Sequence, residues 1–292
     1  MGISVAETAS ITAALRPNPV LSVGADTIGH GTLYNQNQNT SPTDVNVRVD
    51  YPIERAHKRE LRIDAAGYQR RIVQARVEDS VRRLRLDVTL ACIDVIEAKT
   101  KLALANDNLQ ALNGIVSLNE ARLRGGAIAP LELTRSRVAM LQFRAGVKTA
   151  ELAVATSRAR LQTLLGRKPS DPLVDVSDPL QIPLPASGPD VELLRTRALD
   201  ARPDIRAIQL DQARSQADLR LQIAQGKVDF SVGSEYHNTQ GITGPVSSVG
   251  FFFSALLPVY NRNQGEIARA RAEQTQIARG LTALQSQVNG EI

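Results

Sequence analysis

The feature that most constrains the fold is an uninterrupted stretch, residues 53–129, that contains no proline. Apolar side chains recur along it with alternating spacings of three and four residues, a heptad pattern typical of a helix packed on another helix. At about 1.5 Å per residue, a helix over residues 54–124 would be a rod about 100 Å long. Such a rod has no core of its own, so we expect it to pack on neighbouring helices. The heptad positions are Val81, Leu84, Val88, Ala91, Val95, Ala98, Leu102, Ala105, Leu109, Leu112 and Val116.

A second apolar stripe lies off the heptad positions of the same helix, which predicts packing on two sides. The helix ends at the segment RLRGGAIAP, 122–130, where two glycines release it and Pro130 suits the first turn of the next helix. We therefore predict a helical hairpin with its tip at residues 125–130. The second stripe consists of Leu86, Leu90, Ile93, Leu104, Ile115 and Leu118.

Two shorter helices are predicted to return along the rod. The first runs from about residue 131 to 165, and the second begins at Arg202-Pro203-Asp204 and ends near Gln225. Six prolines between residues 169 and 189 exclude a long helix between them. Helices of about 35 and 23 residues, stacked end to end, would match the length of the rod. Heptad spacing in the first return helix selects Val138, Leu141, Ala145, Leu152, Ala155 and Ala159.

Two other regions read as pairs of β-strands. Apolar and polar residues alternate strictly in DVNVRVDY, 44–51, and in VDFSVGSEY, 228–236, and two further strands precede and follow them. Polar segments at 29–43 and 237–246 would connect them into two hairpins. A half-buried sheet of a soluble protein shows this pattern. A transmembrane β-barrel shows it too, with apolar residues toward lipid and polar residues toward a wet lumen.

The barrel is the favoured interpretation, because the hairpins sit at the ends of long rods with no nearby helical domain to cover one face. Four strands cannot close a barrel, so several chains must contribute. The apolar positions then face lipid: Val45, Val47, Val49, Val228, Phe230 and Val232. The polar positions face the lumen: Asn46, Arg48, Asp50 and Asp229.

The chain contains an internal repeat in which a strand passes through a proline into a helix. Superposing Pro52 on Pro258 also aligns Glu60 with Glu266, and the strands upstream share Ser-Val-Gly at an offset of 209 residues. Internal similarity at a fixed offset indicates two copies of one structural unit. The predicted strand-to-helix junction residues are Pro52, Pro258, Asn261, Arg262 and Gly265.

Composition excludes several classes of function. The net charge of +5 comes mostly from arginines interleaved with acidic residues, without an aromatic platform for bases, so we expect no nucleic-acid binding. The three histidines, His30, His57 and His237, have no metal-ligand spacing, and Cys92 lies alone within a helical pattern. We therefore predict no catalytic site, no cofactor and no metal site.

These features together resemble the TolC-like outer membrane efflux factors, and most closely their cobalt-zinc-cadmium resistance branch. The motifs that carry the resemblance are Pro17-Asn18-Pro19, the segment 52–59, the tip Gly125–Pro130, Arg202-Pro203-Asp204 and LPVYNRNQGEIARA. The resemblance implies a mostly helical chain with β-hairpins. Three protomers would each give four strands to a 12-stranded outer-membrane β-barrel, and their long coiled-coil helices would form a periplasmic α-barrel.

The resemblance also implies partners and a place in the cell. It implies a homotrimer in the outer membrane of a Gram-negative bacterium, in contact with outer-membrane lipid, a periplasmic adaptor protein and an inner-membrane RND-type pump. The chain would be the passive exit duct of that tripartite system, with heavy-metal cations as one cargo. Adaptor docking would fall on the tip residues Arg122, Arg124, Gly125, Gly126, Ala127, Pro130 and Arg135.

Other functions stay open at this point. Within the same class, the duct would serve drug efflux or type I protein secretion. A periplasmic adaptor or another coiled-coil scaffold would also carry heptads, but it would not repeat a strand pair about 207 residues apart.

The predicted organisation runs from an N-terminal helix tail to a second long helix. Compared with the family pattern, that second helix looks truncated, which suggests a fragment without the gate. The predicted segments are 1–16, the helix tail; 17–53, the first hairpin; 54–166, the helical hairpin; 167–202, the proline-rich equatorial segment; 203–225, the stacked helix; 226–259, the second hairpin; and 260–292, the start of the second long helix.

Overall fold

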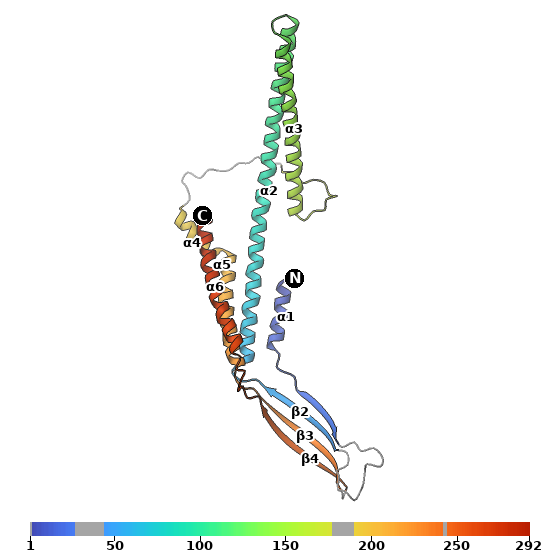
Figure 1. Cartoon of the computed structure of the whole chain (residues 1–292), viewed down its shortest axis with the longest axis vertical. Helices are drawn as coiled ribbons and strands as arrows, with labels where there is room; N and C mark the ends of the chain where they lie inside the picture. Colours follow the sequence, from blue (N-terminus) through green and yellow to red (C-terminus); the bar gives the residue numbers. More distant parts are fainter. Residues whose placement is uncertain (1, 27–43, 177–189, 242–243) are drawn as a thin grey trace. The chain divides into compact units, whose positions relative to one another are not determined.

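The computed structural model describes residues 2–26, 44–176, 190–241 and 244–292, which form two compact units (Figure 1). One unit comprises residues 1–78 and 190–292 and holds the sheet. The other comprises residues 79–189 and holds a helical hairpin. The long helix α2, Lys58–Arg124, contributes to both units and runs for 67 residues without interruption. The predicted mostly helical fold with β-hairpins is confirmed.

The sheet has four antiparallel strands in the order β1-β2-β3-β4. They are β1 Val20–Asp26, β2 Asp44–Ile53, β3 Phe230–Gly241 and β4 Gly244–Ala255. The two sequence repeats meet at the central pair, where Val47 of β2 lies opposite Tyr236 of β3. The prediction of a polar loop over residues 237–246 is wrong, because β3 continues to Gly241 and β4 begins at Gly244. The predicted loop at 29–43 lies outside the described residues.

Four further helices belong to the unit with the sheet. They are α1 Gly2–Ala14, α4 Val191–Ala201, α5 Pro203–Gln225 and α6 Gln264–Glu291. Helix α4 was not predicted from the sequence; it begins at Val191, two residues after Pro189, the last proline of the proline-rich segment. Its N-cap Asp190 accepts hydrogen bonds from the backbone N–H groups of Glu192 and Leu193, which stabilises the helix start. Helices α5 and α6 pack on each other.

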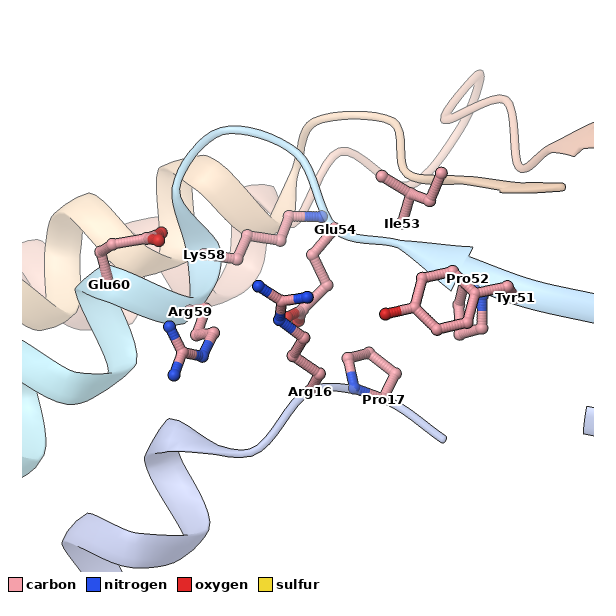
Figure 2. A pocket seen from close by; sticks show the side chains of 9 residues that line it. All are labelled: Arg16, Pro17, Tyr51, Pro52, Ile53, Glu54, Lys58, Arg59 and Glu60. Carbon is pink, nitrogen blue, oxygen red and sulfur yellow. The ribbon is translucent and has the colours of Figure 1, made fainter. Parts of the chain in front are cut away.

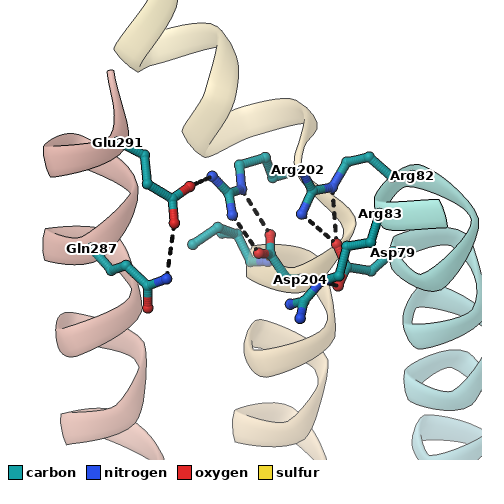
Figure 3. A network of polar contacts seen from close by, with 8 residues as sticks. Asp79, Arg82, Arg83, Arg202, Asp204, Gln287 and Glu291 are labelled. Carbon is teal, nitrogen blue, oxygen red and sulfur yellow. Dashed lines mark hydrogen bonds and ion pairs between the residues drawn. The ribbon is translucent and has the colours of Figure 1, made fainter. Parts of the chain in front are cut away.

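The Arg-Pro-Asp motif forms the turn between α4 and α5. Arg202 binds both carboxylate oxygens of Asp204, at 3.1 and 2.7 Å, and also reaches Glu291 of α6 at 2.5 Å (Figure 3). Pro203 occupies the first turn of α5, where its missing N–H costs nothing. The hydrogen bond from Arg202 lowers the pKa of the Glu291 carboxyl below its usual value. The motif thus fixes the start of α5 against α6.

The other unit is a hairpin of α2 and α3, Pro130–Leu164. Its core contains Ala91 and Val95 from the predicted heptad positions of α2, packed with Leu161 of α3. The heptad residues predicted for α3 do not pack in this hairpin, because Val138, Leu141 and Leu152 are exposed in the single chain. The face of α3 that is buried instead carries Leu133, Val147, Val154 and Leu161.

A segment after α3 folds back onto this hairpin. Val174 and Val176 pack against the hairpin core, and Lys99 donates a hydrogen bond to the Val176 carbonyl oxygen at 2.7 Å. Asp175 lies between two cations, 2.5 Å from Lys99 and 2.8 Å from Arg158. These contacts attach residues 174–176 to both helices.

Candidate functional site

The two faces of the sheet differ in chemistry. Along β2, exposed Val45, Val47 and Val49 alternate with half-buried Asn46, Arg48 and Asp50. The register continues the apolar face across the sheet, because Val47 lies opposite Val23 of β1 and Tyr236 of β3. Val232 belongs to this exposed face as well. One face is therefore apolar although it is exposed in the single chain.

The polar face is linked by its own side-chain contacts. Arg48 binds both oxygens of Asp50 at 2.8 Å and lies 4.4 Å from the centre of the Phe252 ring. Asn46 donates to Glu235 of β3 at 2.9 Å. His237 joins Glu235 to Asp44, with nitrogen–oxygen distances of 2.6 and 3.2 Å. These charges are paired with one another on one face of the sheet, and Glu235 is buried among them.

Aromatic side chains occupy the apolar face near the helices. Phe230 of β3 and Phe253 of β4 are diagonal neighbours across the strand pair, with their ring centres 5.4 Å apart. Tyr51 and Phe251 are exposed on the same face. Phe230 itself is half-buried.

Two predicted strand positions belong to the junction with the helices. Val228 and Asp229 precede β3, which begins at Phe230, so their assignment to the alternating strand is wrong. Asp229 accepts a hydrogen bond from Lys58 Nζ at 2.6 Å and another from the Arg55 backbone N–H at 2.9 Å. The Asp229 carboxylate therefore joins the start of the second sequence repeat to the strand-to-helix junction of the first.

The junction residues also hold the end of α1. Arg59 donates to the Ala14 carbonyl oxygen at 2.7 Å, and Arg62 donates to that of Leu15 at 3.3 Å. Carbonyls at the end of a helix have no partner within it, so these arginines satisfy them. Arg62 also binds both oxygens of Glu54, which raises the pKa of the Arg62 guanidinium. Figure 2 shows Glu54 and Arg59 among the residues that line a cavity between the end of α1 and the end of β2.

Both repeats use left-handed backbone at the same place. Superposing Pro52 on Pro258 aligns His57 with Asn263, and these residues have φ values of 57° and 62°. Ala56, next to His57, has a φ of 59°. This conformation is unfavourable for residues other than glycine and turns the chain sharply. It converts the direction of a strand into that of a helix.

The second junction has further local contacts. Asn261 accepts from the Asn263 backbone N–H at 2.9 Å, and Arg262 donates to the Pro258 carbonyl oxygen at 3.2 Å. Asn263 donates to the backbone and side chain of Gln222 in α5. Gly265 lies in the first turn of α6, where its φ is not positive and a Cβ would meet nothing within 4 Å.

The predicted tip is an ordered turn at the end of the hairpin. Gly126 has a φ of 74°, the Ala127 N–H donates to the Arg122 carbonyl oxygen at 2.8 Å, and the Gly126 N–H donates to that of Leu123 at 3.0 Å. These two bonds with a left-handed glycine define a Schellman motif, which ends a helix. Pro130 begins α3. Gly125 does not have a positive φ.

The tip arginines fall into two groups. Arg135 pairs with Glu132 at 3.0 Å within α3, and Arg137 pairs with Glu120 at 2.8 Å across the hairpin. Arg122 and Arg124 are exposed, and no ion pair among the described residues involves them. The tip therefore presents free positive charge beside an ordered turn.

No described helix is both long and apolar enough to cross a bilayer. In the described part of the chain, histidine, cysteine and acidic side chains form no group of three that would hold a metal ion.

Comparison with known proteins identifies the family to which this chain belongs. The family model for outer membrane efflux proteins matches residues 7–167, more than half of the chain. The chain belongs to the outer membrane efflux protein family. Members of this family are outer-membrane proteins of Gram-negative bacteria and are channels, not enzymes. This membership argues against the adaptor and scaffold alternatives.

The cobalt-zinc-cadmium resistance protein CzcC of Cupriavidus metallidurans is 25% identical over 223 residues, which cover 76% of this chain and 52% of that protein. The chain thus spans about half the length of this curated relative. Among solved structures, CusC is 18% identical with a TM-score of 0.71, covering 99% of this chain and 68% of that one. VceC of Vibrio cholerae is 16% identical with a TM-score of 0.71, covering 98% and 70%. These structures share the fold.

Proposed function

We propose that the chain forms part of an outer-membrane duct, the passive exit of a tripartite efflux system. The observation that carries this proposal is the sheet whose exposed face is apolar and whose opposite face carries paired charges. In water such an exposed apolar face is unfavourable, whereas in a bilayer it contacts lipid and leaves the charged face toward a wet lumen. Val45, Val47, Val49 and Val232 then face lipid, and Asn46, Arg48 and Asp50 face the lumen.

Three copies of the chain complete the duct in this proposal. Strands β1 and β4 are the outer strands of the sheet, and four strands are too few to close a barrel. Three sheets would give the 12 strands that the resemblance implies. The helices also support assembly of several copies, because the second stripe of α2, with Leu86, Leu104 and Leu118, is exposed in the single chain. Packing on a neighbouring copy would bury it.

The tip is the proposed docking surface for a periplasmic adaptor, through which an RND-type inner-membrane pump is engaged. An exposed, ordered turn with the unpaired cations Arg122 and Arg124 suits binding to carboxylates of a partner. Gly126→Val in the full-length protein should abolish efflux, because a β-branched residue disfavours the left-handed conformation. Assembly and membrane insertion should remain.

The matched control is Gly125→Ala, whose Cβ would make ordinary contacts of 3.6 Å with the Ala121 and Arg122 carbonyl oxygens. This variant should export normally. Equal efflux by both variants would contradict a role of the tip in docking, and loss of assembly by Gly126→Val would show that the turn serves folding instead.

For the cargo we propose heavy-metal cations, on the similarity to a cobalt-zinc-cadmium resistance protein. The duct itself needs no metal-binding residues, because the pump selects the cargo. Deletion of the full-length gene should raise sensitivity to cobalt, zinc and cadmium salts, with restoration by the wild-type gene. Increased sensitivity only to drugs, or loss only of a secreted protein, would assign the duct to drug efflux or type I secretion.

A further inference from the structure

Beyond the duct itself, the junction between sheet and helices carries a surface with two complementary parts. The aromatic side chains of Tyr51, Phe230 and Phe253 lie on the apolar face at the end of the sheet nearest the helices. Arginines lie just beyond them, toward the helices. Arg55 lies over the Phe230 ring, with its guanidinium carbon 5.9 Å from the ring centre.

Arg16 lies beside the same end of the sheet. It lines a cavity of about 220 Å³ together with Tyr51 and Ile53 (Figure 2). Ile53 is opposite Phe230 in the register, and Phe230 is the ring that Arg55 covers. Arg16 and Arg55 therefore flank the same corner of the apolar face.

The arginines here are not neutralised by the nearby carboxylates. Glu54 and Glu60 line the same cavity. Arg62 binds both oxygens of Glu54, and Glu60 lies 3.9 Å from His57. Asp229 is held by Lys58 at 2.6 Å. Within the described residues, neither Arg16 nor the guanidinium of Arg55 has an ion-pair partner. The corner therefore combines an excess of positive charge with exposed aromatic rings.

We infer that Arg16 and Arg55 bind the phosphate of an anionic phospholipid in the inner leaflet of the outer membrane. Aromatic rings prefer the boundary between acyl chains and headgroups, and arginines beyond them reach the headgroup phosphates. The anionic headgroup complements the unpaired guanidinium groups, whereas a zwitterionic headgroup offers no net charge. This inference rests on the proposed insertion of the sheet into the membrane.

The test measures lipid binding to the purified full-length protein by native mass spectrometry in detergent, with added phosphatidylglycerol or phosphatidylethanolamine. The wild type should prefer phosphatidylglycerol. Each of Arg16→Gln and Arg55→Gln should weaken phosphatidylglycerol binding about fivefold, the effect of removing one basic residue near an anionic membrane surface. Binding of phosphatidylethanolamine should change little. Arg16→Lys and Arg55→Lys, which keep the charge, should retain most of the preference.

The matched control is Arg144→Gln, at an exposed position on α3 in the hairpin unit, which should bind both lipids as the wild type does. Equal binding of the two lipids by the wild type, or undiminished preference in both glutamine variants, would overturn the inference. A loss of subunit association without a change in lipid preference would do so too, by assigning the corner to contact between copies. Retention of neither lipid by the wild type would also overturn the inference, whereas failure of the sheet to insert would appear separately as the absence of heat-modifiable trimer from outer membranes.

Discussion

Lys58 Nζ lies 2.6 Å from Asp229 Oδ2, and this ion pair joins the start of the long helix to the start of the second sequence repeat. The Lys58 side chain is only 7% exposed, whereas that of Asp229 is 41% exposed. Lys58 also donates to the Lys227 carbonyl oxygen at 3.0 Å. The pair thus connects two segments 171 residues apart at the edge of the proposed membrane region.

Lys58→Met should lower the stability of the protein by about 1.5 kcal/mol, the lower range for hydrogen bonds to charged groups, because Asp229 stays partly solvated. Asp229→Asn should cost more, since an amide whose oxygen accepts from the Arg55 N–H leaves the nearly buried Lys58 ammonium without a counter-ion. Thermal denaturation of the full-length protein in detergent measures both. The double variant should be less destabilised than the sum of the single variants. Strict additivity would show that the two side chains do not interact.

The left-handed residue at the first junction gives a second prediction. The His57 side chain is 88% exposed, so changes there act mainly through the backbone. His57→Gly should raise stability by about 1 kcal/mol relative to His57→Val, which disfavours the positive φ. At the equivalent Asn263, glycine should raise the stability relative to the wild type by less than it does at His57, because it removes two hydrogen bonds to Gln222. A larger gain at Asn263 than at His57 in the same denaturation assay would refute this reading.

The sequence was sufficient to predict the elements with strong local signals. The heptad positions Ala91 and Val95 do form the hairpin core, and strict alternation identified β2. The predictions failed where contacts between residues distant in the sequence determine the structure. The exposed face of α3 carries the predicted heptad residue Leu152, because a heptad does not reveal which partner covers it. The neighbouring prolines argued against a helix at the position of α4, although Asp190 is a favourable N-cap residue.

The junction contacts were the main site feature that sequence reasoning missed. Proline marked the position, but nothing in the sequence indicates that Lys58 pairs with Asp229 or that Arg59 caps α1. These pairs depend on how the repeats meet in the sheet. By contrast, the glycine requirement at Gly126 was visible, since a glycine pair before a proline is typical of a helix end.

The segment that follows α3 should respond to pH. The hydrogen bond from Lys99, and then that from Arg158, lower the pKa of the Asp175 carboxyl below its ordinary value of 3.8. Because the folded-state pKa is depressed, the contribution of this pair is present at neutral pH. It weakens as the pH falls below the ordinary value toward the folded-state pKa.

Hydrogen exchange over residues 167–176, corrected for the intrinsic pH dependence, should therefore show loss of protection only in that acidic range. Asp175→Asn should reduce protection at neutral pH and remove most of the pH dependence. If Asp175→Asn left the protection at neutral pH unchanged, the ion pairs would not hold this segment.

The two faces of β2 should differ in their tolerance of charge. Val47→Arg should cost roughly 2–4 kcal/mol if this position is near the middle of the lipid, whereas Asn46→Arg should cost much less. Asn46 also lies 2.9 Å from Glu235, which an arginine there would be placed to pair with. The fraction of heat-modifiable trimer recovered from outer membranes reports both variants. Equal recovery would contradict the assignment of faces.

The most direct test of the account is the location of the tip relative to the membrane. Single cysteines at Ala127 in the tip and at Asp26, the end of β1 remote from the helices, are introduced into the full-length protein with Cys92→Ala. Whole cells are then treated with a membrane-impermeant maleimide, and adaptor cross-linking is assayed separately. We predict that Asp26→Cys is labelled from outside, while Ala127→Cys is protected and cross-links to the adaptor. Labelling of Ala127→Cys from outside the cell would contradict it.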